Sequence, residues 1–313
     1  MMLALTIDLD PLWCYRAIYG LPAAEPADGI TATAAERFRR LAAELGMRGT
    51  LFTVGATLDD EAAAASLAAA AAAGHEIACH SHEHHYDLSR RPEEEMADDL
   101  RRANEAIQRA CGSRPRGFRA PGYLLGERLL PVCERLGFAY DSSVLPAPLY
   151  QGAKGLARLL LGAAGRRSAS LPGDAREALA PAAPYRPDPH APWRRGEGRL
   201  LELPISTVLG VPLTGAVLAL LGPSRTGWLA GLLRRRRFVC LELHGLDLMD
   251  IAADGLDPGL RLQPDARLPW QRKYEAVLNF CRPLLDSHRP VTLAGAARLL
   301  AGEEPGEDAA PGS

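Results

Sequence analysis

Short apolar runs alternate with longer helical patterns along the first half of the chain, and this alternation constrains the fold more than any other feature. Residues 3–9 are predicted as a buried strand, and residues 32–45 follow with helical spacing that ends at Gly46. The same order recurs, with predicted strands at 50–54, 76–79, 117–119 and 139–140 and predicted helices at 60–73, 92–111 and 127–136. Repeated strand–helix units imply a parallel sheet, open or closed into a barrel.

The length of the chain favours one domain. Its 313 residues, of which 47% are hydrophobic, can bury one large core, and single-domain barrels of ~250 residues with insertions are common. We therefore expect one domain over residues 1–301. The tail at 302–313 is acidic and contains proline and glycine, so we expect it to be disordered.

The alternation fails between residues 146 and 199. An apolar basic stretch at 154–167 is followed there by a proline-rich run. We interpret 146–199 as an insertion or a long loop. Regular structure is expected to resume with a strand at 200–203, helices near 213–221 and 227–236, a strand at 238–243, a helix at 270–287 and a last strand and helix within 291–300.

Charge, cysteine content and the N-terminus argue against several classes of protein. The 36 basic and 38 acidic side chains nearly cancel, whereas nucleic-acid-binding proteins usually carry a basic excess on one face. The six cysteines form no CxxC pair, so we expect reduced thiols and a cytoplasmic location. The first residues lack the features of a signal peptide, and no apolar run reaches the ~18 residues of a spanning helix.

A histidine-rich segment follows the predicted strand at 76–79. His80 and His84 are four residues apart, a spacing that lets two imidazoles on one side of a helical turn reach one ion. Asp8 and Asp10 lie at the end of the first predicted strand, where period-two geometry points both carboxylates to the same side. One of them can complete a three-ligand metal site with a position open for water, while the other serves as a base.

Each of these patterns also has a simpler explanation. A histidine cluster can be a solvated loop that binds metal weakly, and an acidic pair that closes a strand can cap a helix. Both patterns, however, stand at the same end of successive predicted strands, the end at which parallel α/β folds place their sites. Together they favour one functional site over two unrelated loops.

Five segments together resemble a known family. TIDLDP contains Asp8 and Asp10, HSHEH begins at His80, FRAPGY contains Arg119, YDSS begins at residue 140, and LELHG contains His244. They are similar to the motifs of the NodB-homology polysaccharide deacetylases, which are of the carbohydrate esterase family four type. The resemblance covers residues 3–300 and implies a distorted (β/α)7-type barrel.

The first motif departs from the usual family pattern. Most members have two adjacent acids there, whereas Leu9 separates the two acids of this chain. The spaced form looks like the branch that includes peptidoglycan deacetylases and lipid-linked aminoarabinose deformylases.

The resemblance also implies a role for each motif residue. It implies a divalent metal ion held by Asp10, His80 and His84, with Asp8 as general base, Arg119 as the group that holds Asp8, His244 as general acid, Asp141 as an orienting group for Arg119 or His244, and Pro121 and Tyr123 as residues of the substrate groove. Zinc suits two imidazoles and one carboxylate, although cobalt, iron and nickel suit the same ligands. A backbone N–H near Tyr123 is expected to help stabilise an oxyanion.

The resemblance implies a hydrolase that removes an N-acetyl or N-formyl group from an amino sugar in a glycan or glycoconjugate. Residues 154–167 and 211–222 could form an apolar rim that accepts a lipid-linked sugar at the inner membrane face, although ordinary barrel helices are the better-supported alternative. Because the first motif departs from the usual family pattern, deacylation of a non-sugar amide or imide stays an alternative. A non-enzymatic carbohydrate- or metal-binding module is the least supported alternative, because base, ligands, arginine and acid are all present.

Overall fold

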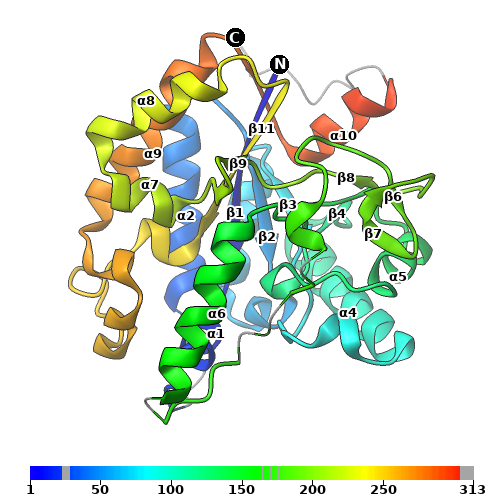
Figure 1. Ribbon diagram of the computed structural model, residues 1–313, viewed down its shortest axis with the longest axis horizontal. Coiled ribbons are helices and arrows are strands. Elements are labelled where there is room, and N and C mark those ends of the chain that lie inside the picture. Colours follow the sequence, from blue (N-terminus) through cyan, green and yellow to red (C-terminus); the bar gives the residue numbers. More distant parts are fainter. Residues whose placement is uncertain (23–28, 164, 170, 172, 175, 304–313) are drawn as a thin grey trace.

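The computed structural model describes residues 1–22, 29–163, 165–169, 171, 173–174 and 176–303 of the chain. Its centre is a curved sheet of eight strands (Figure 1). These strands are β1 (Met2–Leu9), β2 (Thr50–Thr53), β3 (Glu76–Cys79), β4 (Gly117–Phe118), β5 (Tyr140–Asp141), β8 (Leu201–Glu202), β11 (Phe238–His244) and β12 (Arg289–Val291). Two short hairpins lie outside this sheet, β6 (Pro187–Asp188) with β7 (Ala191–Arg195) and β9 (Thr207–Val208) with β10 (Val211–Pro212).

The sheet runs in the order β11–β1–β2–β3–β4–β5–β8, and β12 pairs with the first half of β1. Every pairing in this sheet is parallel, as the strand–helix alternation predicts. The two ends of the sheet approach each other through irregular backbone after β8, where Ser206 N donates to Cys240 O (3.1 Å) and Glu242 N donates to Leu213 O (3.2 Å). The result is an α/β half-barrel, which confirms the predicted fold class.

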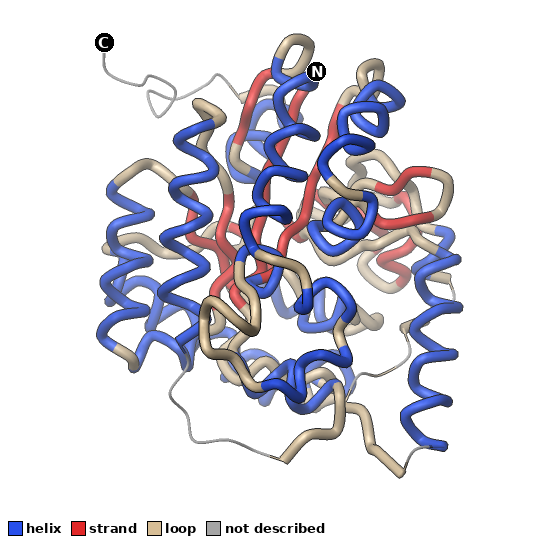
Figure 2. Tube along the Cα trace, turned by 90° about the vertical axis from the view of Figure 1, so that its left-hand side faces the viewer, coloured by secondary structure: helices blue, strands red, loops and turns tan. Residues whose placement is uncertain are grey.

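Helices cover the outside of the curved sheet (Figures 1 and 2). The α-helices are α1 (Leu12–Ile18), α2 (Gly29–Glu44), α3 (Glu61–Ala72), α4 (Glu93–Cys111), α5 (Leu129–Arg135), α6 (Pro148–Ala163), α7 (Gly215–Leu221), α8 (Pro223–Leu233), α9 (Trp270–Leu285) and α10 (Leu293–Ala301). Short 3-10 helices are η1 (Gly55–Asp59), η2 (Leu88–Arg90), η3 (Pro121–Tyr123), η4 (Glu177–Leu179), η5 (Gly245–Leu248), η6 (Pro258–Leu262) and η7 (Pro264–Arg267). None of the helices in the described ranges is long and apolar enough to cross a membrane.

Alternation along β1 explains how the fold positions its polar residues. Leu3, Leu5, Ile7 and Leu9 are fully buried in the core between the sheet and the helices. The intervening Ala4 belongs to a second cluster inside the curve of the sheet, with Phe52, Ala78, Tyr140 and Cys240 among its members. Because successive side chains of a strand point to opposite faces, Thr6 and Asp8 follow Ala4 to this inner face.

The segment at 146–199 contains more regular structure than the sequence predicts. It forms α6 and the β6–β7 hairpin, and it connects β5 to β8, its parallel neighbour in the sheet. The insertion or long loop predicted at 146–199 contains a helix at 148–163, because this stretch has no proline after its first residue and is rich in the helix-forming residues leucine and alanine. Disorder was predicted for residues 302–313, of which 304–313 lie outside the described part of the chain.

Candidate active site

The polar residues singled out in the sequence meet at the carboxyl ends of the strands. Asp8 lies near the end of β1, directly opposite His244 of β11 in the parallel register. His80 and Arg119 are the first residues after β3 and β4. Because the carboxyl ends of parallel strands form one edge of the sheet, residues separated by more than 230 positions in the sequence come together there.

Asp10, His80 and His84 form a buried cluster of three donors. Oδ1 of Asp10 lies 3.2 Å from Nε2 of His80 and 3.2 Å from Nε2 of His84, and the candidate ligand atoms all lie within 4.8 Å of one another. Asp10 Oδ1 and both ring nitrogens of His84 have no hydrogen-bond partner among the described residues. Buried polar atoms normally have partners, so two imidazoles and a carboxylate that face each other in this way fit a divalent cation with an open position.

The loop that carries the histidines is held in an unusual backbone conformation. Ser81 and His84 have positive φ values of 64° and 53°, and the hydroxyl of Ser81 accepts a hydrogen bond from His84 N (3.0 Å). From α4, the buried carboxylate of Asp99 accepts hydrogen bonds from His82 N (2.8 Å) and Glu83 N (3.1 Å). These contacts offset the cost of the left-handed residues and aim both imidazoles at Asp10.

A backbone contact also fixes the orientation of the His80 ring. Nδ1 of His80 lies 2.8 Å from the carbonyl oxygen of Arg119. A carbonyl can only accept, so Nδ1 carries the proton and Nε2 presents its lone pair to the cluster. Ligand histidines in metal sites are commonly oriented by a hydrogen bond of this kind.

Electrostatics keep the cluster ready to bind a cation. Burial works to raise the pKa of Asp10, but the nearby His84 and His80 outweigh it and hold that pKa well below its usual value. Burial works to lower the pKa of His80, but Asp8 and Asp10 reverse the effect and raise it. The carboxylate of Asp10 is therefore ionised, and the pocket around it attracts positive charge.

Asp8 is held by a completely buried arginine. Arg119 Nη1 donates to Asp8 Oδ1 (2.6 Å) and to Thr6 Oγ1 (3.2 Å). Arg119 Nε and Nη2 donate to the carbonyl and hydroxyl oxygens of Ser142 (2.8 and 2.9 Å), and the guanidinium lies over the ring of Phe52. The second oxygen of Asp8, Oδ2, lies 3.9 Å from His80 Nε2 and faces the three-donor cluster.

His244 belongs to a second polar group that the sequence did not predict in full. Its Nε2 lies 3.1 Å from the hydroxyl of Tyr123 and 3.8 Å from Glu242 Oε1, and the same hydroxyl hydrogen-bonds to Glu242. Behind the ring, Asp247 Oδ2 accepts a hydrogen bond from His244 N (2.7 Å). The side chain of His244 is 26% exposed, whereas those of Asp8 and Glu242 are buried, so the imidazole is the group of these three that solvent can reach.

Neighbouring carboxylates control the charge of His244. Burial works to lower the pKa of its imidazole, but the negative charge of Glu242, followed by Asp10, Asp8 and Asp247, raises that pKa to about 9. Burial raises the pKa of Glu242 in turn. Glu242 was missed in the sequence, although a signal was available: it lies two residues before His244 in the same strand and therefore points to the same face.

The predicted role of Asp141 is not supported by its contacts. Its carboxylate accepts hydrogen bonds from the backbone N–H and hydroxyl of Ser143 (3.1 and 2.7 Å), and Ser143 Oγ accepts from Ala120 N (2.7 Å). Among the described residues, neither Arg119 nor His244 hydrogen-bonds to it. Ser142 contacts Arg119, and Asp141 secures the neighbouring backbone, so the orienting role of Asp141 stays a prediction.

The two groove residues Pro121 and Tyr123 form the turn η3. Pro121 is buried at its start, and Gly122 and Tyr123 have positive φ values of 62° and 65°. This turn brings the Tyr123 hydroxyl to Glu242 and His244. The backbone N–H of Tyr123 donates to Ala120 O (3.0 Å), so the structure does not favour that N–H as an oxyanion donor.

Part of the chain matches the model of a known protein family. Residues 24–140 match the model of the polysaccharide deacetylase family. The matched segment includes His80, His84 and Arg119, while Asp8, Asp10 and His244 lie outside it and are brought to the site by the fold. No curated protein sequence matches the chain significantly.

One solved structure shares the fold of this chain, and two others align with it less closely. A protein of Mycobacterium smegmatis described as a polysaccharide deacetylase aligns with 100% of this chain and 94% of its own, at 20% identity and a TM-score of 0.56. The Xyl-CE4 domain of a multidomain xylanase from the hindgut metagenome of Trinervitermes trinervoides aligns over 97% and 92% of the two chains (11% identity, TM-score 0.45). A family 4 acetyl xylan esterase from Clostridium thermocellum, solved with a cobalt ion, aligns over 97% and 93% (14% identity, TM-score 0.45).

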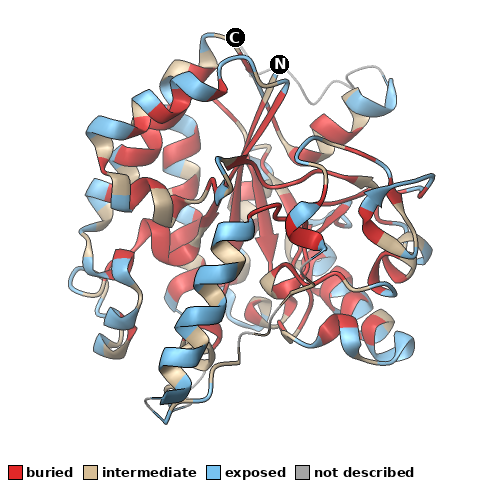
Figure 3. Cartoon of the chain, in the orientation of Figure 1, coloured by how far each residue is buried: buried red, intermediate tan, exposed pale blue. Residues whose placement is uncertain are grey.

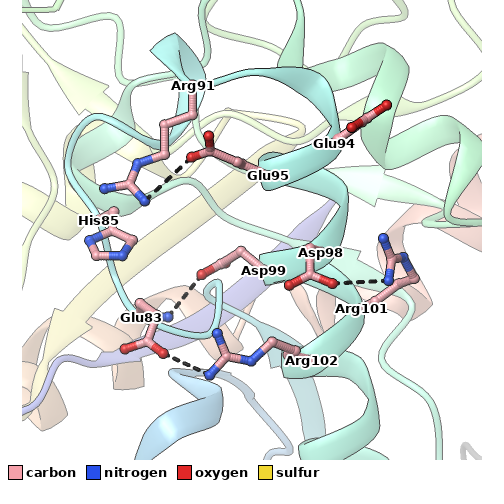
Figure 4. Close-up of a pocket in the computed structure, with 9 residues that line it drawn as sticks. All are labelled: Glu83, His85, Arg91, Glu94, Glu95, Asp98, Asp99, Arg101 and Arg102. Atoms are coloured by element: carbon pink, nitrogen blue, oxygen red, sulfur yellow. Dashed lines mark hydrogen bonds and ion pairs between the residues drawn. The ribbon is translucent and has the colours of Figure 1, made fainter.

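The other histidines of the loop lie apart from the three-donor cluster. His82 is buried against Gly55, and His85 lines a separate depression of about 460 Å³ beside α4 (Figure 4). Charged side chains of this depression pair with each other, as Glu83 does with Arg102 (2.8 Å) and Asp98 with Arg101 (3.1 Å). Because these charged side chains form ion pairs with one another, we assign the depression no role in the chemistry. It is lined by Glu83, His85, Arg91, Glu94, Glu95, Asp98, Asp99, Arg101 and Arg102.

Proposed function

We propose that this protein is a metal-dependent hydrolase that removes the N-acetyl or N-formyl group from an amino sugar in a glycan or glycoconjugate. One observation carries the proposal: a carboxylate fixed by a buried arginine, Asp8, faces a three-donor cluster of Asp10, His80 and His84 at one end of the sheet. The match to the polysaccharide deacetylase family model supports a carbohydrate as the substrate.

The three donors of the cluster would hold the metal ion. A divalent ion bound there supplies polarisation of the acyl carbonyl and a water of lowered pKa. Zinc is the ion we propose, because borderline ligands such as imidazole and carboxylate suit it, and cobalt, iron and nickel are the alternatives.

Asp8 is proposed as the general base. Arg119 occupies its Oδ1 and leaves Oδ2 directed toward the ligand cluster, where the attacking water must lie. Because Oδ2 of Asp8 has no contact with Arg119, it is free to accept the proton of that water. Ser142 and Thr6 hold the guanidinium and thereby set the direction of the carboxylate.

His244 is proposed as the general acid that donates a proton to the leaving amine. Its raised pKa keeps the imidazole protonated at neutral pH, and its partly exposed side chain can reach a leaving group of a bound substrate. Tyr123 and Glu242 hold the ring by contacts at Nε2, so they are proposed as positioning residues.

The substrate class is tested by comparing three kinds of acylated compound. The protein is supplied with zinc, and acetate or formate release is measured from N-acetylated chitooligosaccharides, from a lipid-linked N-acyl sugar and from small cyclic imides. We expect turnover with the sugars and none with the imides. Turnover confined to imides would favour the amidase alternative, and zinc binding without turnover of any compound would favour a non-enzymatic binding module.

A further inference from the structure

A second group of possible metal ligands lies beside the three-donor cluster. Asp8, Glu242 and His244 each offer one ligand atom, and these atoms all lie within 4.8 Å of one another. They come from β1 and β11, which run side by side and are buried along most of their length (Figure 3). We call this group the second cluster. Its two carboxylates and one imidazole are ligand types that zinc accepts.

The geometry of the two strands brings these three side chains together. Asp8 and His244 are direct partners in the parallel register, and Glu242 lies two residues before His244 and points to the same face. Nε2 of His244 lies 3.8 Å from Oε1 of Glu242. Donors bound to one zinc ion lie roughly 3.3 Å apart, because metal–ligand distances are about 2.1 Å and the angles are tetrahedral. Small side-chain rotations therefore bring the donors of the second cluster to one ion.

Glu242 has an unused acceptor atom in this cluster. Its side chain is fully buried, and Tyr123 donates to Oε1, whereas Oε2 has no hydrogen-bond partner among the described residues. Buried polar atoms normally have a partner. Asp8 also keeps one oxygen for another ligand, because Arg119 holds Oδ1. A cation bound between these carboxylates would supply the partner that Oε2 of Glu242 lacks.

The second cluster should bind zinc more weakly than the three-donor cluster does. His244 is proposed as the general acid, so its Nε2 must release a proton before it can bind an ion. The guanidinium of Arg119, which pairs with Asp8 (2.6 Å), also repels a second cation. We therefore expect zinc at the second cluster only when it is in excess over the first site.

We propose that Asp8, Glu242 and His244 form a second, weaker zinc site that inhibits the enzyme. An ion there occupies both the carboxylate proposed as base and the imidazole proposed as acid, so hydrolysis stops while the first ion stays bound. One zinc ion per chain gives the active form, and excess zinc gives an inactive form. The inhibition rests on the proposed function, whereas the binding of a second ion does not.

Equilibrium dialysis of the full chain against zinc measures the number of bound ions. We expect two ions per chain, the second bound at least roughly tenfold more weakly than the first. Glu242→Gln keeps the shape of the side chain but lacks the carboxylate, so it should bind only the tighter ion. His244→Gln removes another ligand and should do the same. Glu44→Gln, at an exposed position, is the matched control and should bind two ions.

Acyl release at increasing zinc concentration tests the inhibition. The parent should reach its highest rate near one zinc ion per chain. Its rate should then fall by at least roughly 100-fold as the second ion binds, because the base and the acid are both occupied. Each protein is compared with its own rate at one ion per chain, since Glu242→Gln slows hydrolysis by itself. The rate of Glu242→Gln should not fall further in excess zinc.

Three results would overturn the second site. The first is a parent that binds a single zinc ion, and the second is a second ion bound equally by the parent, Glu242→Gln and His244→Gln. The third is a parent whose rate does not change when the second ion binds. A protein that binds two ions, loses the second in Glu242→Gln and hydrolyses no acylated compound would contradict the proposed function and leave the second site in place. Thermal unfolding without zinc checks that each variant folds.

Discussion

Asp8 lies in β1 and Asp10 just after its end, and yet the two carboxylates have different partners. Arg119 satisfies Asp8 through a buried ion pair, whereas Asp10 faces His80 and His84. The difference comes from the segments that lie beside each of them, the residue after β4 for Asp8 and the loop after β3 for Asp10. Environment assigns separate tasks to two groups of the same chemical type.

The base assignment is tested by Asp8→Asn. Asparagine keeps the shape of the side chain but cannot accept the proton of the water, so kcat/KM for acyl release should fall by about 10²- to 10⁴-fold. Zinc affinity, measured by titration calorimetry, should change little because the three proposed ligands are intact. Asp98→Asn, an exposed carboxylate paired with Arg101, is the matched control. Full activity in Asp8→Asn would contradict the assignment.

The role of Glu242 is tested by the pH dependence of Glu242→Gln. His244 must be protonated to donate, so kcat of the parent should fall as pH rises through about 9, the pKa of His244. Removing the largest charge that raises this pKa should move the alkaline limb of the profile to lower pH. Glu44→Gln, at an exposed surface position, should leave the limb in place. An unshifted limb in Glu242→Gln would show that Glu242 does not control His244.

The raised pKa of His244 also makes the stability of the folded protein depend on pH. The pKa of His244 is higher in the folded protein (about 9) than its ordinary value of 6.5. Folding therefore favours the protonated form, and this contribution is fully present below pH 6.5. It is lost as pH rises from 6.5 through about 9.

At the scale of elements, α4 supports the histidine loop from outside the candidate site. Asp99 in the middle of that helix accepts two backbone hydrogen bonds from the residues between the two histidines. A side chain of this helix thus provides hydrogen-bond acceptors for the N–H groups of a loop whose backbone is strained. The strands bring the ligands to one edge, and α4 sets the shape of the loop that carries two of them.

Asp99→Ala tests this support. The loop would lose both hydrogen bonds, and we expect zinc affinity to fall by about 10- to 100-fold, as for other residues that orient ligands. Titration calorimetry on the variant gives the measurement. Asp98→Ala on the exposed side of the same helix is the control, and it should bind zinc as the parent does. Equal zinc affinities for the two variants would show that Asp99 does not support the histidine loop.

At the scale of the whole molecule, the proposed metal links two segments of the chain. Ligands from the end of β1 and from the loop after β3 meet only when the sheet is formed. An ion that binds the folded state stabilises it by about 2.7 kcal/mol at a free concentration 100 times its Kd. The Tm should therefore rise with zinc concentration and return on addition of a chelator.

Calorimetric scans of His84→Ala test this linkage. The variant should show little rise in Tm with zinc, because it lacks one ligand of the cluster. His190→Ala, in the exposed turn of the β6–β7 hairpin, is the matched control and should respond as the parent does. An undiminished rise in His84→Ala would place the bound zinc elsewhere in the protein.

Much of the architecture could be predicted from the sequence because its signals are local. The apolar run at 238–243 corresponds to β11, and the spaced acids, the histidine loop and FRAPGY all follow predicted strands. The helix α6 overlaps the apolar basic stretch at 154–167, for which an ordinary barrel helix was the better-supported alternative. The side of this helix that meets the protein could not be predicted, since a helical period does not say which side packs.

The sequence by itself determined that strands and helices alternate and that candidate ligands stand at the strand ends, because side-chain periodicity and chain order are local properties. Only the tertiary structure decided which groups meet across the sheet. The parallel register of β1 and β11 sets Asp8 opposite His244, and the order of the strands brings Arg119 to Asp8 across 111 residues of chain. Such partners depend on strand order, register and inward packing, which no short stretch of sequence contains.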